Sequence, residues 1–182
     1  MQTVKLGATR LEVTPIAYGT WQFGGDWGPV DERAAVDAIR HARSLGINFF
    51  DTAQAHGFGR ALAVELCGRQ EQLVIAPKSG LRMDGDRLVR DASPAWLRKG
   101  VAASLEALGI DYIDLYQVHR PDPGTPNRET AATLANLVRE GLSRHVGVAN
   151  YSTAQITEFA AVLPAGTVQP PYGATEITGL GL

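Results

Sequence analysis

The sequence has little of what marks several large classes of protein. It contains one cysteine, Cys67, in 182 residues, which excludes an internal disulfide and a metal site made of cysteines alone. It has no apolar run long enough to span a bilayer, and its first residues lack the apolar stretch of a signal peptide. We therefore expect a cytoplasmic protein with no membrane partner.

An excess of positive charge is also missing. The sequence holds 17 Lys and Arg against 19 Asp and Glu, for a formal net charge of -2 and a pI near 6.1. This balance gives no reason to expect nucleic acid as a partner. Hydrophobic residues make up 45% of the chain and charged residues 20%, which is enough for a sizeable core. We expect a single domain over residues 1–182.

Strand-like apolar runs alternate with stretches of helical periodicity, which predicts an α/β fold with a parallel sheet covered by helices. The predicted strands are residues 4–6, 11–13, 16–18, 48–51, 73–76, 113–118, 145–149 and 167–169. The predicted helices are residues 31–46, 59–67, 93–108, 130–140 and 152–163. The first two strands are expected to pair as a hairpin within residues 1–14.

Three polar residues follow apolar runs in the same way: Asp51, Lys78 and His119. Each has an ordinary interpretation by itself, as a helix cap, a solvated loop lysine or a loop histidine. If the runs are parallel strands, however, all three side chains converge on one rim of the sheet, where such folds carry out chemistry. The repetition at successive strand ends therefore predicts an active site.

Four strings, GINFFDTA, SLEALGIDYIDLYQVHRPDP, RHVGVANYS and VQPPY, resemble those of aldo-keto reductases, and the resemblance runs from residue 4 to 172. It implies a TIM-type (β/α) barrel and NADPH-dependent reduction of aldehydes or ketones. The barrel units fall in residues 15–172, whereas residues 173–182 are an atypical tail. We therefore expect an incomplete barrel of about six parallel strands after an N-terminal β-hairpin, without the family's last strands.

The resemblance also implies a catalytic tetrad of Asp, Tyr, Lys and His, in which Tyr gives a proton to the carbonyl oxygen. Asp51, Lys78 and His119 match three of its members, and the Tyr position falls on His56. An imidazole can exchange a proton near neutrality, but beside Lys78 it is expected to stay neutral. We therefore expect carbonyl reduction to be weakened or altered.

The cofactor residues implied by the resemblance are Asn150 and Gln169, which match residues that bind the nicotinamide, together with Gly19 and Thr20 after the first barrel strand. Ala149 stands where the family has a serine. The loops that would hold the phosphates of NADPH would lie beyond Tyr172, and no glycine-rich dinucleotide motif replaces them. We therefore expect the grip on NADPH to be weakened.

Aromatic residues after the first barrel strand could form an apolar wall of a substrate pocket, or could pack within the loop: Trp21, Phe23 and Trp27. A metal site from Asp51, His56 and His119 is chemically allowed, but nothing in their spacing demands it, and we predict none.

Three functions stay open from the sequence. The first is reduction of a small carbonyl compound, which is the family reaction. The second is a cofactor-independent acid/base enzyme on the same rim, such as a dehydratase, isomerase, lyase or cyclase. The third is a non-catalytic assembly or binding subunit. An incomplete barrel has open sheet edges, so we also expect a homo-oligomer, or a tail folded back over an open edge.

Overall fold

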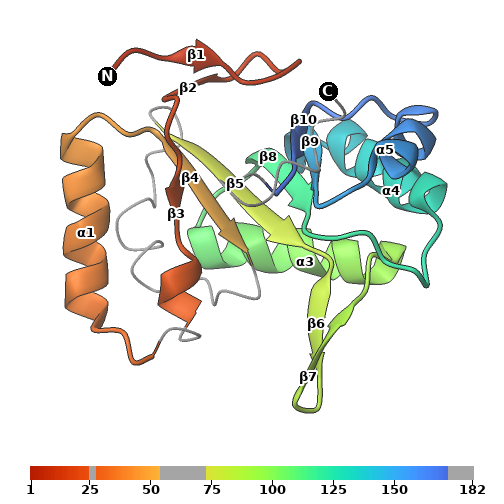
Figure 1. Ribbon diagram of the computed structural model, residues 1–182, viewed down its shortest axis with the longest axis horizontal. Helices are drawn as coiled ribbons and strands as arrows, with labels where there is room; N and C mark the ends of the chain where they lie inside the picture. The colour runs from red at the N-terminus through yellow and green to blue at the C-terminus, as the bar shows by residue number, and fades with distance from the viewer. Residues whose placement is uncertain (25–27, 54–72, 172–182) are drawn as a thin grey trace.

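The protein is built on one parallel sheet of six strands, which forms a half-barrel (Figure 1). The computed structural model describes residues 1–24, 28–53 and 73–171. Within them the sheet order is β10-β9-β8-β5-β4-β3, so neighbours in space are also neighbours along the chain apart from a hairpin after β5. The strands are β3 (Tyr18–Gly19), β4 (Phe49–Ala53), β5 (Val74–Ser79), β8 (Ile113–Val118), β9 (Ser143–Ala149) and β10 (Thr167–Gln169). The predicted fold, an incomplete barrel of parallel strands, is confirmed.

A small antiparallel hairpin precedes the sheet, as the sequence predicts. Its strands are β1 (Val4–Lys5) and β2 (Glu12–Val13), with Val4 opposite Val13. The hairpin lies across the end of the sheet at which the strands begin (Figure 1). It therefore covers the end opposite to the rim where the polar residues lie.

Helices cover one face of the sheet, and polar residues cap the start of α1, α3 and α5. They are α1 (Glu32–Ser44), α3 (Pro94–Leu108), α4 (Asn127–Arg139) and α5 (Thr153–Ala160). Asp31 caps α1 by accepting from two backbone N–H groups, and Ser93 caps α3 ahead of a proline. Ser152 and Gln155 form a capping box at α5. None of the helices in the described part of the chain is long and apolar enough to cross a membrane.

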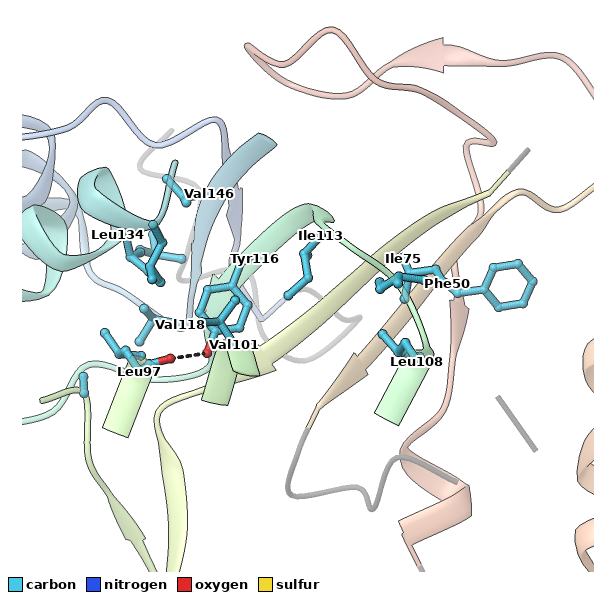
Figure 2. Close-up of a cluster of buried hydrophobic side chains, with 14 of the residues drawn as sticks. Phe50, Ile75, Leu97, Val101, Leu108, Ile113, Tyr116, Val118, Leu134 and Val146 are labelled. Atoms are coloured by element: carbon cyan, nitrogen blue, oxygen red, sulfur yellow. Dashed lines mark hydrogen bonds between the residues drawn. The ribbon is translucent and has the colours of Figure 1, made fainter. Parts of the chain in front are cut away.

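The larger core lies between the sheet and the helices. Phe50, Ile75, Tyr116 and Val118 point from the strands into this layer, where α3 contributes side chains such as Leu97 (Figure 2). The buried Tyr116 hydroxyl donates to the Leu97 carbonyl at 3.1 Å, so its polar atom is satisfied inside the apolar cluster.

A smaller core occupies the inner face of the half-barrel. Leu11 and Val13 from the N-terminal hairpin pack there against Val74, Ala76 and Leu115. Successive residues of a strand point to opposite faces of the sheet, so a residue that lies between two inner-core residues points to the helices. The same alternation decides which way the functional side chains point.

Several predicted boundaries are wrong by two or more residues. The first barrel strand is β3 at Tyr18–Gly19, not residues 16–18, and α4 begins at Asn127, not at residue 130. Strand β5 continues past Pro77 to Ser79, so Lys78 lies inside a strand and not after one. Proline lacks an N–H donor, but β5 keeps its pairing with β4 through that position, with Thr52 opposite Pro77.

One element is missing from the predicted set altogether. After β5 the chain forms an antiparallel hairpin of β6 (Leu81–Asp84) and β7 (Arg87–Arg90), closed by Gly85 and Asp86. Gly85 has a φ of +59°, which suits a glycine in a two-residue hairpin turn. The predicted helix over residues 59–67 lies outside the described residues.

Candidate active site

A buried ion pair forms the centre of the site. The Lys78 ammonium donates to both carboxylate oxygens of Asp51, at 2.5 Å each. Lys78 is only 4% exposed, whereas the Asp51 side chain keeps 19% of its surface exposed. Gln169 adds a longer contact from its side-chain amide to the same carboxylate, at 3.3 Å. Burying a charged group is costly unless an opposite charge is paired with it, and Asp51 is that partner for the Lys78 side chain.

Strand alternation explains why this pair faces the inside of the half-barrel. Phe49 and Asp51 share one face of β4, and Val74, Ala76 and Lys78 share one face of β5. Phe49, Val74 and Ala76 belong to the inner core, so the two charged side chains continue that face at the ends of their strands. Lys78 is paired with Ala53, two residues past Asp51, and its long side chain reaches back to the carboxylate.

Asn150, directly after β9, links the ends of the two strands on either side of it, β8 and β10. It is the one described residue other than glycine with a positive φ, at 61°. Its side-chain amide donates to the His119 carbonyl at 2.8 Å, and its backbone N–H donates to the Gln169 carbonyl at 3.0 Å. The left-handed backbone is unfavourable for most residues but is tolerated by asparagine. Asn150 therefore holds the carboxyl ends of β8, β9 and β10 together.

These residues line a common cavity of about 660 Å³ at the rim of the half-barrel. This volume lies in the usual range for a small-molecule site. Eight residues named from the sequence line it: Gly19, Thr20, Trp21, Asp51, Lys78, His119, Asn150 and Gln169.

Phe23 is not brought to this cavity. Its ring lies 6.3 Å from that of Tyr18, and it packs against the core between sheet and helices. It follows Trp21 by two residues in the 3-10 helix η1 (Trp21–Gly24), whose tight turn sends the two side chains in different directions. Trp27 and His56, also named from the sequence, lie outside the described residues.

Residues that the sequence analysis missed line the cavity as well. The β6–β7 hairpin contributes four of them, which are Leu81, Met83, Asp86 and Leu88. The signal that could have revealed the hairpin is the Asp-Gly-Asp turn between two short runs of alternating character. Arg120, directly after His119, also lines the cavity.

The described residues fit the nicotinamide end of a cofactor. The side-chain amides of Asn150 and Gln169 offer donors and acceptors of the type that pairs with a carboxamide. Gly19 and Thr20 line the same cavity from the other edge of the sheet, and a Cβ at Gly19 would meet no atom within 4 Å. No group of three His, Cys, Asp or Glu that could hold a metal occurs in residues 1–24, 28–53 and 73–171.

Comparison with known proteins gives this arrangement a family. The Aldo/keto reductase family model matches residues 15–177, which is most of the chain. The chain belongs to this family. The resemblance of the four strings to aldo-keto reductases is thereby confirmed.

Individual aldo-keto reductases are similar over nearly the whole chain. Aldo-keto reductase YhdN of Bacillus subtilis is 40% identical across 97% of this chain and 55% of its own length. NADH-specific methylglyoxal reductase of Escherichia coli is 35% identical, across 94% and 59%. The glycerol dehydrogenase AKR11B4 from Gluconobacter oxydans superposes with a TM-score of 0.84 at 34% identity, across 94% and 55%. The chain thus spans somewhat more than half the length of these aldo-keto reductases.

Proposed function

We propose that this chain carries the carbonyl-reducing site of an aldo-keto reductase, acting on a small aldehyde or ketone with a reduced nicotinamide cofactor. The observation that carries the proposal is the buried Lys78 ammonium, fixed by Asp51 in the same cavity as His119, Asn150 and Gln169. Family membership and the reductase names of the relatives support it.

The charged pair suits the electrostatics of carbonyl reduction. The bound cofactor supplies a hydride to the carbonyl carbon, and negative charge then develops on the carbonyl oxygen. A cation already oriented in a water-poor site stabilises that charge without reorganisation. Lys78 is such a cation, because Asp51 holds its ammonium from one side and leaves its charge in the cavity. His119, at the end of the neighbouring strand β8, orients the oxygen.

The proton that the oxygen must receive comes, in our proposal, from the protonated form of His56, at the position where the family has tyrosine. Because we expect this side chain to be mostly neutral beside Lys78, the donor is scarce and reduction is slow. Histidine can act as a general acid near neutral pH, but its ring differs from a phenol in reach and geometry. His56→Tyr is therefore expected to raise kcat about tenfold or more, whereas His56→Phe lowers it. Equal rates for the wild type and His56→Phe would exclude the role of His56.

The cofactor can be NADH or NADPH. The Escherichia coli relative is named as NADH-specific, so the family resemblance does not settle which one this chain uses. Both cofactors are therefore tested.

The test is oxidation of NADH and of NADPH by the purified chain with methylglyoxal and other small aldehydes. Lys78→Met is expected to lower kcat at least about a hundredfold, in line with the loss of a preorganised charge. Lys99→Met is the matched control, because Lys99 lies over the Trp96 ring on α3, away from the cavity. Failure of the wild type to bind or oxidise either cofactor would overturn the proposal and favour acid/base chemistry or a binding role.

The homo-oligomer remains a proposal, and so does the cytoplasmic location. In the described part of the chain the sheet ends at β3 on one side and β10 on the other. Both strands expose backbone groups that can pair with another strand. Light scattering that shows only a monomer would exclude the oligomer.

A further inference from the structure

The β6–β7 hairpin has one face that is mainly apolar, apart from Arg90 opposite Leu81, and one that is mainly charged, apart from Val89 opposite Arg82. Leu81 and Met83 alternate along β6 with Arg82 and Asp84, and Met83 is directly opposite Leu88 on β7. Leu81, Met83 and Leu88 all line the catalytic cavity, whereas Arg82 and Asp84 pair with each other at 3.5 Å on the other face. In a hairpin the two faces are set by the period of two, so the apolar side of this one is turned to the site.

Two of those apolar side chains are uncovered. Met83 is 59% exposed and Leu88 56%, and Trp21, across the same cavity, is 51% exposed. Exposed apolar residues are ordinary when scattered, but Met83 and Leu88 lie opposite each other and form an apolar wall on the hairpin, and Trp21 on η1 lines the same cavity. Lys78 and His119 also line this cavity, so one bound molecule can contact both the charged group and the apolar wall.

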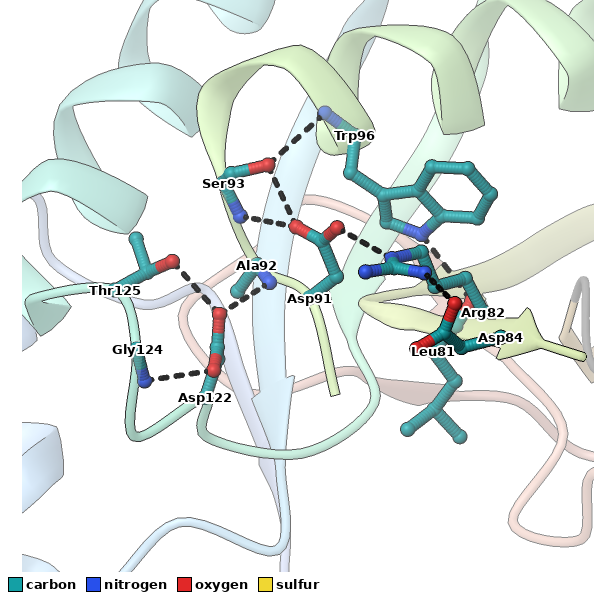
Figure 3. A network of polar contacts seen from close by, with 10 residues as sticks. All are labelled: Leu81, Arg82, Asp84, Asp91, Ala92, Ser93, Trp96, Asp122, Gly124 and Thr125. Atoms are coloured by element: carbon teal, nitrogen blue, oxygen red, sulfur yellow. Dashed lines mark hydrogen bonds and ion pairs between the residues drawn. The ribbon is translucent and has the colours of Figure 1, made fainter. Parts of the chain in front are cut away.

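The hairpin is also held firmly at its base, which a two-stranded hairpin needs because it is marginally stable alone. Arg82 donates to Asp91 at 2.8 Å, and the Trp96 indole on α3 donates to the Leu81 carbonyl at 3.1 Å (Figure 3). Burial works against ionisation of Asp91, but hydrogen bonds from Ser93 and Arg82 outweigh it and hold the pKa of Asp91 below its ordinary value. The carboxylate thus stays charged and keeps the hairpin in place.

A second carboxylate in Figure 3 ties the start of α3 to the loop after β8. Asp122 accepts from the Ala92 N–H at 2.9 Å, the Gly124 N–H at 2.8 Å and the Thr125 hydroxyl at 2.7 Å. The base of the hairpin and the loop that follows His119 are therefore both anchored at the start of α3. The apolar wall has a fixed position relative to the charged end of the cavity.

We propose that the β6–β7 hairpin determines substrate specificity by receiving an apolar substituent of the carbonyl substrate against Met83 and Leu88. The identity of the ligand as a carbonyl compound rests on the proposed function. The preferred substrates are then aldehydes or ketones with an aryl or branched alkyl group, and small polar aldehydes gain nothing from the hairpin. Burying such a group against the two side chains removes apolar surface from water on both partners.

The test compares binding of benzaldehyde with binding of glyceraldehyde, measured by ligand-observed NMR titration of the whole chain. Met83→Ser/Leu88→Ser is expected to raise the Kd for benzaldehyde about tenfold and to leave that for glyceraldehyde nearly unchanged. Arg87→Ser is the matched control, because it alters an exposed hairpin residue that is not among those lining the cavity. Met83→Leu/Leu88→Met keeps the apolar wall and is expected to keep benzaldehyde binding.

Two results would overturn the proposal: no benzaldehyde binding by the wild type, or a loss that is equal for the two aldehydes or equal in Arg87→Ser. Cofactor oxidation is measured on the same samples. Selective binding without cofactor oxidation would refute the reductase function and leave the hairpin as the binding surface. If Met83→Ser/Leu88→Ser oxidises the cofactor with benzaldehyde as fast as the wild type does, only the role of the hairpin is refuted.

Discussion

Removing Asp51 should cost the fold more than removing Lys78, although both changes break the same ion pair. Two unit charges 2.5 Å apart attract by roughly 7 kcal/mol at an effective dielectric constant of about 20, and desolvation of the two ions offsets most of this. What differs is the charge left behind. Asp51→Asn leaves an ammonium that is 4% exposed, whereas Lys78→Met leaves a carboxylate whose side chain is 19% exposed to water.

We therefore expect Asp51→Asn to lower the free energy of unfolding by about 3 kcal/mol and Lys78→Met by about 1 kcal/mol. The double variant should be more stable than Asp51→Asn alone, because no buried charge then lacks a partner. Urea unfolding followed by tryptophan fluorescence measures all three, with unchanged m values as the check on two-state behaviour.

The pair formed by Arg98 and Glu140 is the matched control. It has two short hydrogen bonds, at 2.8 and 2.7 Å, but both side chains are 44% exposed. Glu140→Gln should therefore have the smallest effect of the set, since exposed ion pairs contribute little. The reasoning is refuted if Asp51→Asn destabilises no more than Lys78→Met, or no more than Glu140→Gln.

Two further predictions concern Asn150, which lines the cavity, and the buried Asp114 on β8. In urea unfolding, Asn150→Gly should lower the free energy of unfolding by about 1 kcal/mol less than Asn150→Ala. Both variants lose the same hydrogen bond to His119, but only glycine adopts the positive φ of this position without strain. Equal losses of stability would contradict the role of the backbone. Burial raises the pKa of Asp114 from 3.8 to about 6, with Arg144 opposing the shift. The carboxyl group of Asp114 thus binds its proton more tightly in the folded protein than in the unfolded chain. Protonated Asp114 is compatible with burial, and the free energy of unfolding falls as this group loses its proton between about pH 4 and 6. Asp114→Asn should gain up to about 2 kcal/mol over the wild type at pH 7 and nothing at pH 4; a constant difference between the two pH values would be inconsistent with this.

The parts of the fold that depend on local patterns could be predicted from the sequence. Strands β8 and β10 have the predicted bounds, and Ser93 and Ser152 cap their helices as predicted. Apolar runs and capping side chains act within a few residues of the chain, so their effect does not depend on how distant segments pack. The convergence of Asp51, Lys78 and His119 on one cavity also follows from sequence, because parallel strands end at the same rim.

What the sequence did not reveal depends on contacts between distant segments. The alternation around the Asp-Gly-Asp turn of the β6–β7 hairpin is short, and the hairpin is held through Arg82, Asp91 and Trp96, whose contacts the sequence pattern does not indicate. The direction of Phe23 was missed because η1 turns more tightly than an α-helix. Burial of the Asp51–Lys78 pair could be inferred only once the pairing of β4 with β5 was known.

The N-terminal hairpin has a consequence for the order of folding. Its Ala8 N–H donates to the carbonyl of Gly166, just before β10, and a Cβ on Gly7 would lie 2.5 Å from that same oxygen. During synthesis, residues 7 and 8 therefore have to wait until Gly166, more than 150 residues later in the chain, has been made before they can dock. The sheet can grow strand by strand during synthesis, whereas this closing contact forms only after β9 and β10 have joined it.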